Sequence, residues 1–396
     1  MTPKFAEFKK KVRWRFWALL AAIFTVAGGI IFGAKNMATE FVEPLEYVAR
    51  AIDNLPLLQK EPATQHLSTP AIVRGIYISS WVAGTASWRK DLVSFVENSE
   101  LNSVIIDVKD STGKVSFISD NEKLKALGYF EKRIPEIRKV INELHEKNIY
   151  VIGRIAVFQD GILALKRSDL AIKRKSNGNL WGDKKGLAWV DPASRETWEI
   201  AALVAKEAEK VGFDEINFDY IRFPSDGDLS DMSFPFWDGK TSRSGVIENF
   251  FEYLKNELGT LGVPISADLF GLTSWNYDDL KIGQTLEIAA KHFDYVSPMM
   301  YPSHYPADFQ GFKNPAAHPY EVIKTALTRA KARIIAIGER PEKLRPWIQD
   351  FDLGAKYDAS MIKLQKQAIY DAGLGSWLSW DPANKYTRDG YDPVRN

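Results

Sequence analysis

The chain has 396 residues, of which 45% are hydrophobic and 26% charged, so it can bury a large core and is too apolar to be a disordered protein. Its net charge is +1 at pH 7, but six Lys and Arg residues fall within the first 15 positions, and the mildly acidic remainder has no basic stripe typical of a nucleic-acid partner. There is no Cys, which excludes disulfides and a thiol nucleophile.

The first predicted element is an uncharged apolar run from Phe16 to Ala34. It is long enough to cross about 30 Å of hydrocarbon. A cleaved signal peptide is an alternative to a retained anchor, but the run is long for a signal peptide and no convincing Ala-x-Ala site follows it, which favours the anchor. The positive-inside rule then places residues 1–15 in the cytoplasm and the chain after Lys35 outside it. We therefore expect a single-pass membrane protein with an extracytoplasmic domain.

Residues 35–70 are predicted to contain a helix at 41–58 and a polar linker with two prolines. After Pro70, short runs rich in β-branched and aromatic residues alternate with amphipathic helical patterns. The predicted strands are 75–81, 103–109, 149–157, 213–224, 265–269, 295–300, 344–350 and 375–380, with 333–337 as a weaker alternative for the seventh. The predicted helices are 88–100, 134–147, 193–210, 245–258, 282–291, 319–336 and 358–372.

Eight strands alternating with helices are typical of a closed (β/α)8 TIM barrel of the α/β class, which we expect over residues 71–396. The alternative is an open doubly wound sheet, which would favour a Gly-x-Gly-x-x-Gly turn after an early strand, and no such turn occurs. Few residues follow the eighth strand, so the helix at 41–58 is a candidate to complete the outer ring.

The fourth predicted strand carries an Asp in an apolar setting. Its alternation places Ile216, Phe218 and Tyr220 on one face and Asn217, Asp219 and Ile221 on the other. A carboxylate is costly to bury inside a strand, so Asp219 is either a residue at the strand exit or a functional group at the mouth of the barrel.

Polar residues recur near the C-terminal ends of the other predicted strands. Each one alone is more simply a turn former or a helix cap. As a set they converge on one mouth if the strands form a barrel, where they would share a cavity. The residues are Asp107 and Lys109, Arg154, Asp219, Asp268, Tyr301, Asp350, Trp380 and Asp381.

Several Asp side chains combined with cations and aromatic rings favour cleavage of glycosidic bonds. That chemistry needs two carboxyl groups flanking the bond, and aromatic side chains cover the apolar faces of sugars. The five His show no spacing typical of a zinc site, so no metal or cofactor is predicted. A Mg²⁺ or Ca²⁺ ion held by the same Asp residues stays open as an alternative.

The sequence resembles the glycoside hydrolase domain of bacterial membrane-anchored proteins in the TIM-barrel glycosidase superfamily. The segments that carry the resemblance are Arg74–Tyr77, Ile106–Asp110, Asn217–Pro224, Ser266–Gly271, Ser297–Pro302, Arg345–Phe351 and Trp380. The resemblance implies a polysaccharide or oligosaccharide substrate. It also implies substrate-binding roles for Tyr77, Asp107, Lys109, Arg154, Asn217, Arg222, Tyr301, Trp380 and Asp381.

Analogy with family 13 glycosidases implies roles for three carboxylates, because Asp219, Asp268 and Asp350 lie on the matching strands. Asp219 would be the nucleophile, Asp268 the acid/base and Asp350 the stabiliser, although that family has Glu where Asp268 stands. Family 18 chitinases carry their catalytic Glu where this chain has Ile221, so a chitinase mechanism is disfavoured. We expect a retaining hydrolase; a noncatalytic glycan-binding or envelope scaffold protein is the alternative.

Overall fold

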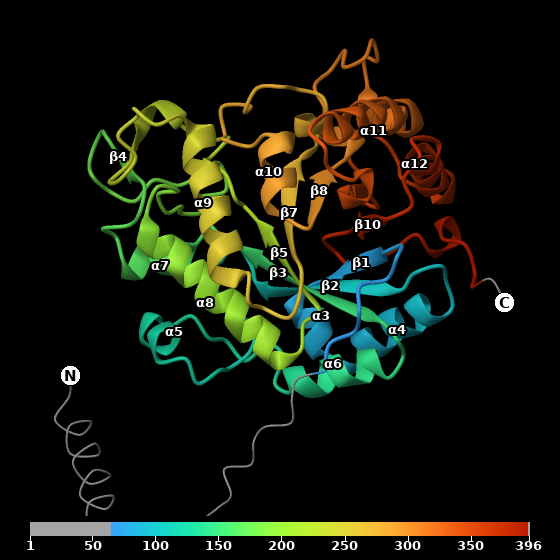
Figure 1. The fold of residues 1–396 in the computed structure, drawn as a ribbon, viewed down its shortest axis with the longest axis horizontal. Helices are drawn as coiled ribbons and strands as arrows, with labels where there is room; N and C mark the ends of the chain where they lie inside the picture. Colours follow the sequence, from blue (N-terminus) through green and yellow to red (C-terminus); the bar gives the residue numbers. More distant parts are fainter. Residues whose placement is uncertain (1–64, 395–396) are drawn as a thin grey trace, which may run out of the picture. The chain divides into compact units, whose positions relative to one another are not determined.

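A closed barrel of eight parallel strands forms the centre of the molecule (Figure 1). The computed structural model describes residues 65–394. The barrel order is β1-β10-β9-β8-β7-β5-β3-β2, so the strands follow one another around the barrel in sequence order. Their bounds are β1 Arg74–Ile78, β2 Ser103–Lys109, β3 Tyr150–Ala156, β5 Glu215–Asp219, β7 Ile265–Phe270, β8 Tyr295–Met299, β9 Trp347–Gln349 and β10 Trp377–Trp380. The predicted TIM barrel is confirmed.

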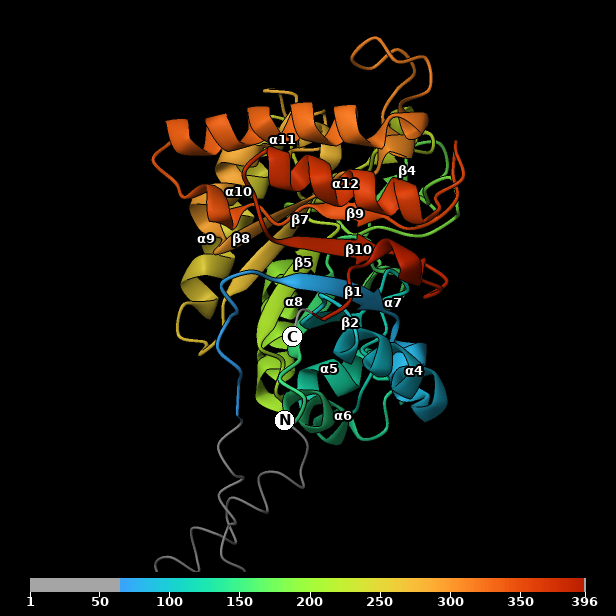
Figure 2. The same ribbon diagram turned by 90° about the vertical axis from the view of Figure 1, so that its right-hand side faces the viewer.

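Helices surround the barrel, as Figures 1 and 2 show from two directions. The α-helices are α3 Ser80–Gly84, α4 Ala86–Glu97, α5 Glu122–Leu127, α6 Ile137–His145, α7 Gly161–Lys166, α8 Arg195–Val211, α9 Arg243–Leu258, α10 Leu286–His292, α11 Pro319–Ala336 and α12 Ala359–Asp371. Residues 333–336 therefore belong to α11, and the seventh strand is the one predicted at 344–350. A small antiparallel pair, β4 Lys173–Arg174 with β6 Met232–Ser233, lies outside the barrel.

The last strand closes the barrel against the first. β10 and β1 lie side by side in both views (Figures 1 and 2), with Arg74 paired to Trp377. No α-helix follows β10 among residues 381–394; instead the C-terminal segment returns to the end of α4, where Ser99 bridges Pro393. The helix expected at 41–58 lies outside the described residues.

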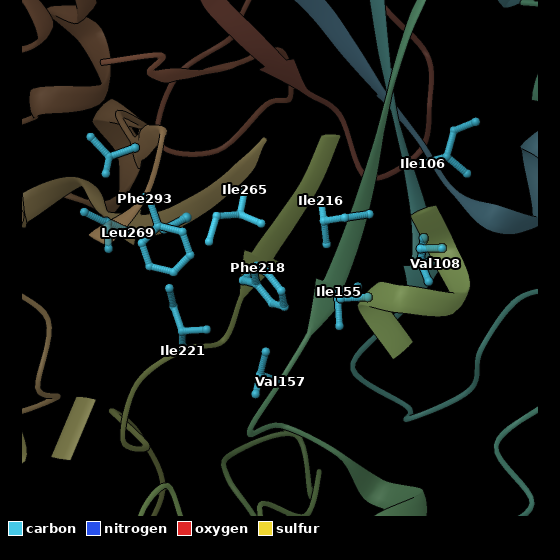
Figure 3. Packing of buried hydrophobic residues seen from close by; sticks show 14 of the residues in the cluster. Ile106, Val108, Ile155, Val157, Ile216, Phe218, Ile221, Ile265, Leu269 and Phe293 are labelled. Atoms are coloured by element: carbon cyan, nitrogen blue, oxygen red, sulfur yellow. The ribbon is translucent and has the colours of Figure 1, made fainter. Parts of the chain in front are cut away.

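The core consists of an interior layer and an outer layer. Alternate residues of each strand point into the barrel or toward the helices. The interior contains Tyr77, Ile105, Ile152, Trp347 and Leu378. The outer layer, part of which Figure 3 shows, contains Ile106, Val108, Ile155, Ile216 and Phe218. Which layer a strand residue joins therefore depends on its position in the alternation.

Residues 65–70 cover the N-terminal end of the barrel. The backbone N–H of Leu67 donates to the fully buried carboxylate of Asp214, 2.7 Å away, and the hydroxyls of Thr69 and Tyr150 are 3.0 Å apart. Below the strands, Arg345 Nη1 donates to Glu215 Oε2 at 2.7 Å. These contacts fill the N-terminal end of the barrel with side chains.

Within residues 65–394, none of the helices is both long and apolar enough to cross a bilayer. The cytoplasmic segment 1–15 and the anchor expected at Phe16–Ala34 lie outside the described residues.

Candidate active site

A cavity of about 540 Å³ opens at the C-terminal ends of the strands. Its floor contains Asp219 from β5 and Asp268 from β7, with Arg154 from β3 beside them. The walls are mainly aromatic and apolar. They include Tyr220, Phe270, Met299, Tyr301, Tyr305, Trp347, Phe351 and Trp380.

Arg154 links the carboxylates of the floor. Its Nη1 donates to Asp107 Oδ1 at 2.7 Å, its Nη2 donates to Asp219 Oδ2, and its Nε lies 3.7 Å from Asp268 Oδ2. Burial alone would lower the pKa of Arg154, but the carboxylates of Asp219 and Asp107 more than offset this and raise that pKa well above its ordinary value. The guanidinium is therefore a fixed positive charge between the strands.

Asp219 is held by a second contact in addition to Arg154. Its Oδ1 accepts the backbone N–H of Tyr220 at 2.6 Å. Both contacts stabilise the ionised carboxylate, because the partners donate to it or carry positive charge. With 6% of its surface exposed and a place in the cavity wall, Asp219 is a charged group that a ligand can reach.

Asp268 has the opposite electrostatic character. Asn217 Nδ2 and Trp347 Nε1 donate to its Oδ1 at 2.9 and 2.8 Å. Burial and the neighbouring charge of Asp219 raise the pKa of Asp268 to about 8, in spite of the opposing effect of Arg154. Asp268 is therefore protonated at neutral pH, and because Oδ1 already accepts two donors, the proton belongs on Oδ2.

A turn at Tyr220 separates the site from the outer core. Tyr220 has φ 53°, in the left-handed region, and this ends the alternation of β5. Ile221 consequently packs in the outer layer beside Phe218, as Figure 3 shows, and Tyr220 lines the cavity. The predicted faces of Tyr220 and Ile221 are therefore wrong, and Ile221 does not point into the mouth.

Two aromatic rings from β1 and β10 and a carboxylate from β2 support Arg154. Tyr77 stacks on Trp380 with ring centroids 3.9 Å apart, and the Arg154 guanidinium lies 5.0 Å from the Trp380 ring. The Tyr77 hydroxyl donates to Asp107 Oδ2 at 2.5 Å. Of these residues only Arg154 and Trp380 line the cavity, so Tyr77 and Asp107 position Arg154 from behind it.

Lys109 does not join the cavity. The pairing of β2 with β3 shifts register between Asp107 and Lys109, so these two residues do not share a face although they are two positions apart in one strand. Lys109 Nζ instead lies 2.8 Å from Asp160 Oδ2 in a buried ion pair, and Asp160 caps α7. The β-bulge therefore assigns Lys109 to the outer layer.

Asp350 and Asp381 are also absent from the cavity lining. Asp350 follows Gln349 and points outward, where its Oδ2 accepts the Tyr391 hydroxyl at 2.8 Å and the Thr387 N–H at 3.0 Å. Asp381 accepts the N–H of Ala383 at 3.0 Å and so stabilises the turn after β10. The structure therefore does not bring the predicted third carboxylate together with Asp219 and Asp268.

The structure adds residues that the sequence reasoning did not assign to the site. Trp347 donates to Asp268 and lines the cavity. His304 also lines the cavity, and burial lowers its pKa, so the ring is neutral. Side chains alternate along β9, so Trp347 and Gln349 share the inward face. This alternation was the sequence signal that could have identified Trp347.

Arg154 should be the most important polar residue for stability. We expect Arg154→Met to lower the free energy of unfolding by about 3–5 kcal/mol, because it leaves the buried Asp107 and Asp219 without their cation. Urea unfolding followed by Trp fluorescence measures the change.

Arg167→Met is the control for that measurement. Arg167 pairs with Asp169 and Glu196, but a third of its side chain is exposed, so the loss should stay below about 1 kcal/mol. Equal losses for the two variants would contradict the role of Arg154.

The described residues contain no group of three His, Asp or Glu side chains arranged to hold a metal ion.

A family model described as "Putative glycosyl hydrolase domain" matches residues 75–386, which include all of the barrel except the first residue of β1. No curated protein matches the chain. The matched range begins in β1 and ends beyond β10, so it contains every residue that lines the cavity.

Two solved structures with TM-scores of 0.58 and 0.50 show the same barrel architecture, and a third is similar in sequence over part of the chain. The glycoside hydrolase domain of PgaB (BpsB) from Bordetella bronchiseptica is 12% identical, covers 82% of this chain and 100% of its own, and has a TM-score of 0.58. The catalytic domain of β-amylase from Paenibacillus polymyxa is 13% identical, with coverage of 82% and 96% and a TM-score of 0.50. A hypothetical protein from Ruminiclostridium thermocellum ATCC 27405 is 34% identical over 49% of this chain and 96% of its own, with a TM-score of 0.45.

Proposed function

The chain belongs to the "Putative glycosyl hydrolase domain" family, and from this membership we propose that it hydrolyses glycosidic bonds of a polysaccharide through Asp219 and Asp268. The observation that carries the proposal is the contrast between these two carboxyl groups. Both lie at one guanidinium on the floor of the cavity, yet Asp219 is stabilised as an anion and Asp268 as an acid. Such a pair supplies the two roles that glycoside hydrolysis needs.

In the proposed first step, an Asp219 oxygen forms a bond to the anomeric carbon while the bond to the leaving sugar breaks. The proton on Asp268 Oδ2 moves to the leaving oxygen, so the aglycone departs as an alcohol. In the second step Asp268, now a carboxylate, takes a proton from water. The water oxygen then replaces Asp219 at the anomeric carbon, which restores both groups.

Other cavity residues would bind and orient the sugar. Trp380 offers an aromatic surface at one wall. Tyr301 lies beside Asp219 and Asp268, and burial, together with these two acidic groups, raises the pKa of Tyr301 well above its ordinary value. The Tyr301 hydroxyl therefore stays protonated and able to donate to a sugar oxygen. Arg222 lines the same cavity.

Incubation of the full chain with a polysaccharide panel tests the proposed function. We expect release of reducing ends from at least one polymer, with Asp219→Asn as the inactive control. Binding without release would favour the noncatalytic glycan-binding alternative, and loss of release on adding a chelator would favour a metal-dependent reaction. Proton NMR of the first product distinguishes retention, which we expect, from inversion.

We also propose that Phe16–Ala34 anchors the protein with the barrel outside the cytoplasm. The support is the length of the uncharged run and the cations that precede it. The protein should stay with bacterial membranes after alkaline carbonate washing, and protease added to spheroplasts should digest the barrel. Protection of the barrel in intact spheroplasts would contradict this topology.

A further inference from the structure

Arg222 is a buried cation in the cavity wall that has no anionic partner in the described structure. Only 8% of its surface is exposed, and its guanidinium forms no ion pair within 4 Å among residues 65–394; the carboxylates of Asp219, Asp226 and Asp183 act on it from farther away. The other arginine that lines the cavity, Arg154, is paired with Asp107 and Asp219 and lies 3.7 Å from Asp268. A buried charge without a counterion is costly, so its presence in a ligand cavity points to an anion supplied by the ligand.

The guanidinium of Arg222 is held in place before any ligand arrives. Its Nη1 donates to the carbonyl of Phe223 at 3.0 Å and to Ser225 Oγ at 3.2 Å. Its carbon centre lies 4.9 Å from the ring centroid of Trp189 and 4.5 Å from that of Phe270. These contacts use one nitrogen and the faces of the group, and they leave the Nε and Nη2 edge for a planar anion.

The charges around the cavity favour an anion at Arg222 over one at the floor. Burial lowers the pKa of Arg222, but arginine remains protonated at neutral pH. At the floor, Arg154 is already occupied by Asp107, Asp219 and Asp268, so it offers no free cation to a second anion. Lys185 is an exposed cation that also lines the cavity, and the exposed Asp226 accepts the backbone N–H of Lys184, so neither residue pairs with the Arg222 guanidinium.

We propose that the substrate is an acidic glycan, and that Arg222 binds the carboxylate of a sugar next to the one cleaved at Asp219. The inference rests on the proposed function. It assigns the substrate class: a polymer containing carboxylate-bearing sugars such as hexuronic acids. Asp219 and Arg222 are three residues apart on the segment that leaves β5, so one turn positions both the reacting group and the carboxylate-binding group.

Binding measurements test this inference separately from turnover. The full chain carrying Asp219→Asn is titrated with hexuronic acid oligosaccharides from alginate, pectin and hyaluronan, and with their carboxyl-reduced neutral forms. We expect at least one acidic oligosaccharide to bind about tenfold or more tightly than its neutral form. Equal affinity, or no binding by any acidic probe, would overturn the inference.

Arg222→Met in the same background should reduce that affinity ratio to about one, because Met keeps an apolar stem between the rings and removes the charge. Arg222→Lys should give an intermediate affinity ratio, since Lys keeps the positive charge but lacks the planar two-nitrogen edge of the guanidinium. Arg243→Met is the matched control: Arg243 also stacks on aromatic rings, Phe223 and Trp237, but does not line the cavity, and its ratio should match the parent.

Two outcomes distinguish a failure of the acidic-substrate inference from a failure of the proposed hydrolase function. Hydrolysis of neutral polymers at the same rate as acidic ones would overturn the acidic-substrate assignment and leave the hydrolase intact. If acidic oligosaccharides bind through Arg222 but the wild-type chain does not cleave them, the acidic-ligand assignment is supported and the proposed hydrolase function is contradicted. Preference for sulfated over carboxylated oligosaccharides would overturn the carboxylate assignment.

Discussion

Asp219→Asn should lower kcat by on the order of 10⁴-fold while the protein stays folded. Asn has nearly the same shape, and its oxygen can still accept the Tyr220 N–H that fixes the side chain. What it lacks is the negative charge and the nucleophilic oxygen that must bond to the anomeric carbon. Turnover of an identified polysaccharide, with circular dichroism as the check on folding, measures the effect.

A second variant separates a nucleophile from a base at this position. Asp219→Gly leaves space on the cavity floor where a small anion can enter. If Asp219 is the nucleophile, added azide should restore cleavage of an activated aryl glycoside and give a glycosyl azide of inverted configuration. If no azide product forms, and the products of the wild-type enzyme are also inverted, Asp219 acts as a base on water.

Asp350→Asn provides the comparison within the barrel. Its carboxylate faces outward and binds Tyr391 and Thr387, so the variant should lose stability and keep most of its kcat. A decrease in kcat comparable to that of Asp219→Asn, at unchanged melting temperature, would show that Asp350 acts in the reaction.

The barrel was predictable because its signals are local and repeated. Strands of β-branched and aromatic residues alternated with amphipathic helices, and the resulting eight units agree with the structure within a few residues. The closing contacts were not local. The C-terminal segment packs against the last two barrel strands through Tyr391, whose hydroxyl forms hydrogen bonds with Asp350 and Ser379. No periodic pattern in the sequence predicts such a contact.

The candidate site was only partly predictable, since position at a strand end is not the same as orientation. Asp350 and Asp381 follow the inward residues Gln349 and Trp380, so strict alternation would have turned both outward. Lys109 required knowledge of a β-bulge, which depends on how two strands pair. The left-handed conformation of Tyr220 likewise has no clear signal in the sequence.

Asp268→Asn should decrease kcat by about 10²–10⁴-fold on natural glycans, because the leaving oxygen no longer receives a proton. The decrease should be much smaller for aryl glycosides whose leaving groups depart as stable anions, whereas Asp219→Asn should be inactive toward both. Measuring both substrates with both variants therefore assigns the roles. An equal loss for Asp268→Asn on the two substrates would show that Asp268 is not the acid.

The pH dependence gives an independent measure of the same proton. Because burial and Asp219 raise the pKa of Asp268 to about 8, the acid is present below that pH, and kcat/KM of the wild type should fall as pH rises above it. In Asp268→Asn this alkaline limb should disappear.

Stability should follow the same titration. The folded state holds the Asp268 proton up to about pH 8, whereas a carboxyl with the ordinary pKa of 3.8 has already released it in the unfolded chain. Wild-type stability from this group is therefore present below pH 4 and is lost as pH rises toward 8. Asn cannot ionise, so the melting temperature of Asp268→Asn should rise relative to that of the wild type as the pH increases from 4 to 8. A constant difference between the two proteins would mean that Asp268 is ionised in the folded state, and the proposed acid would then have no proton to donate.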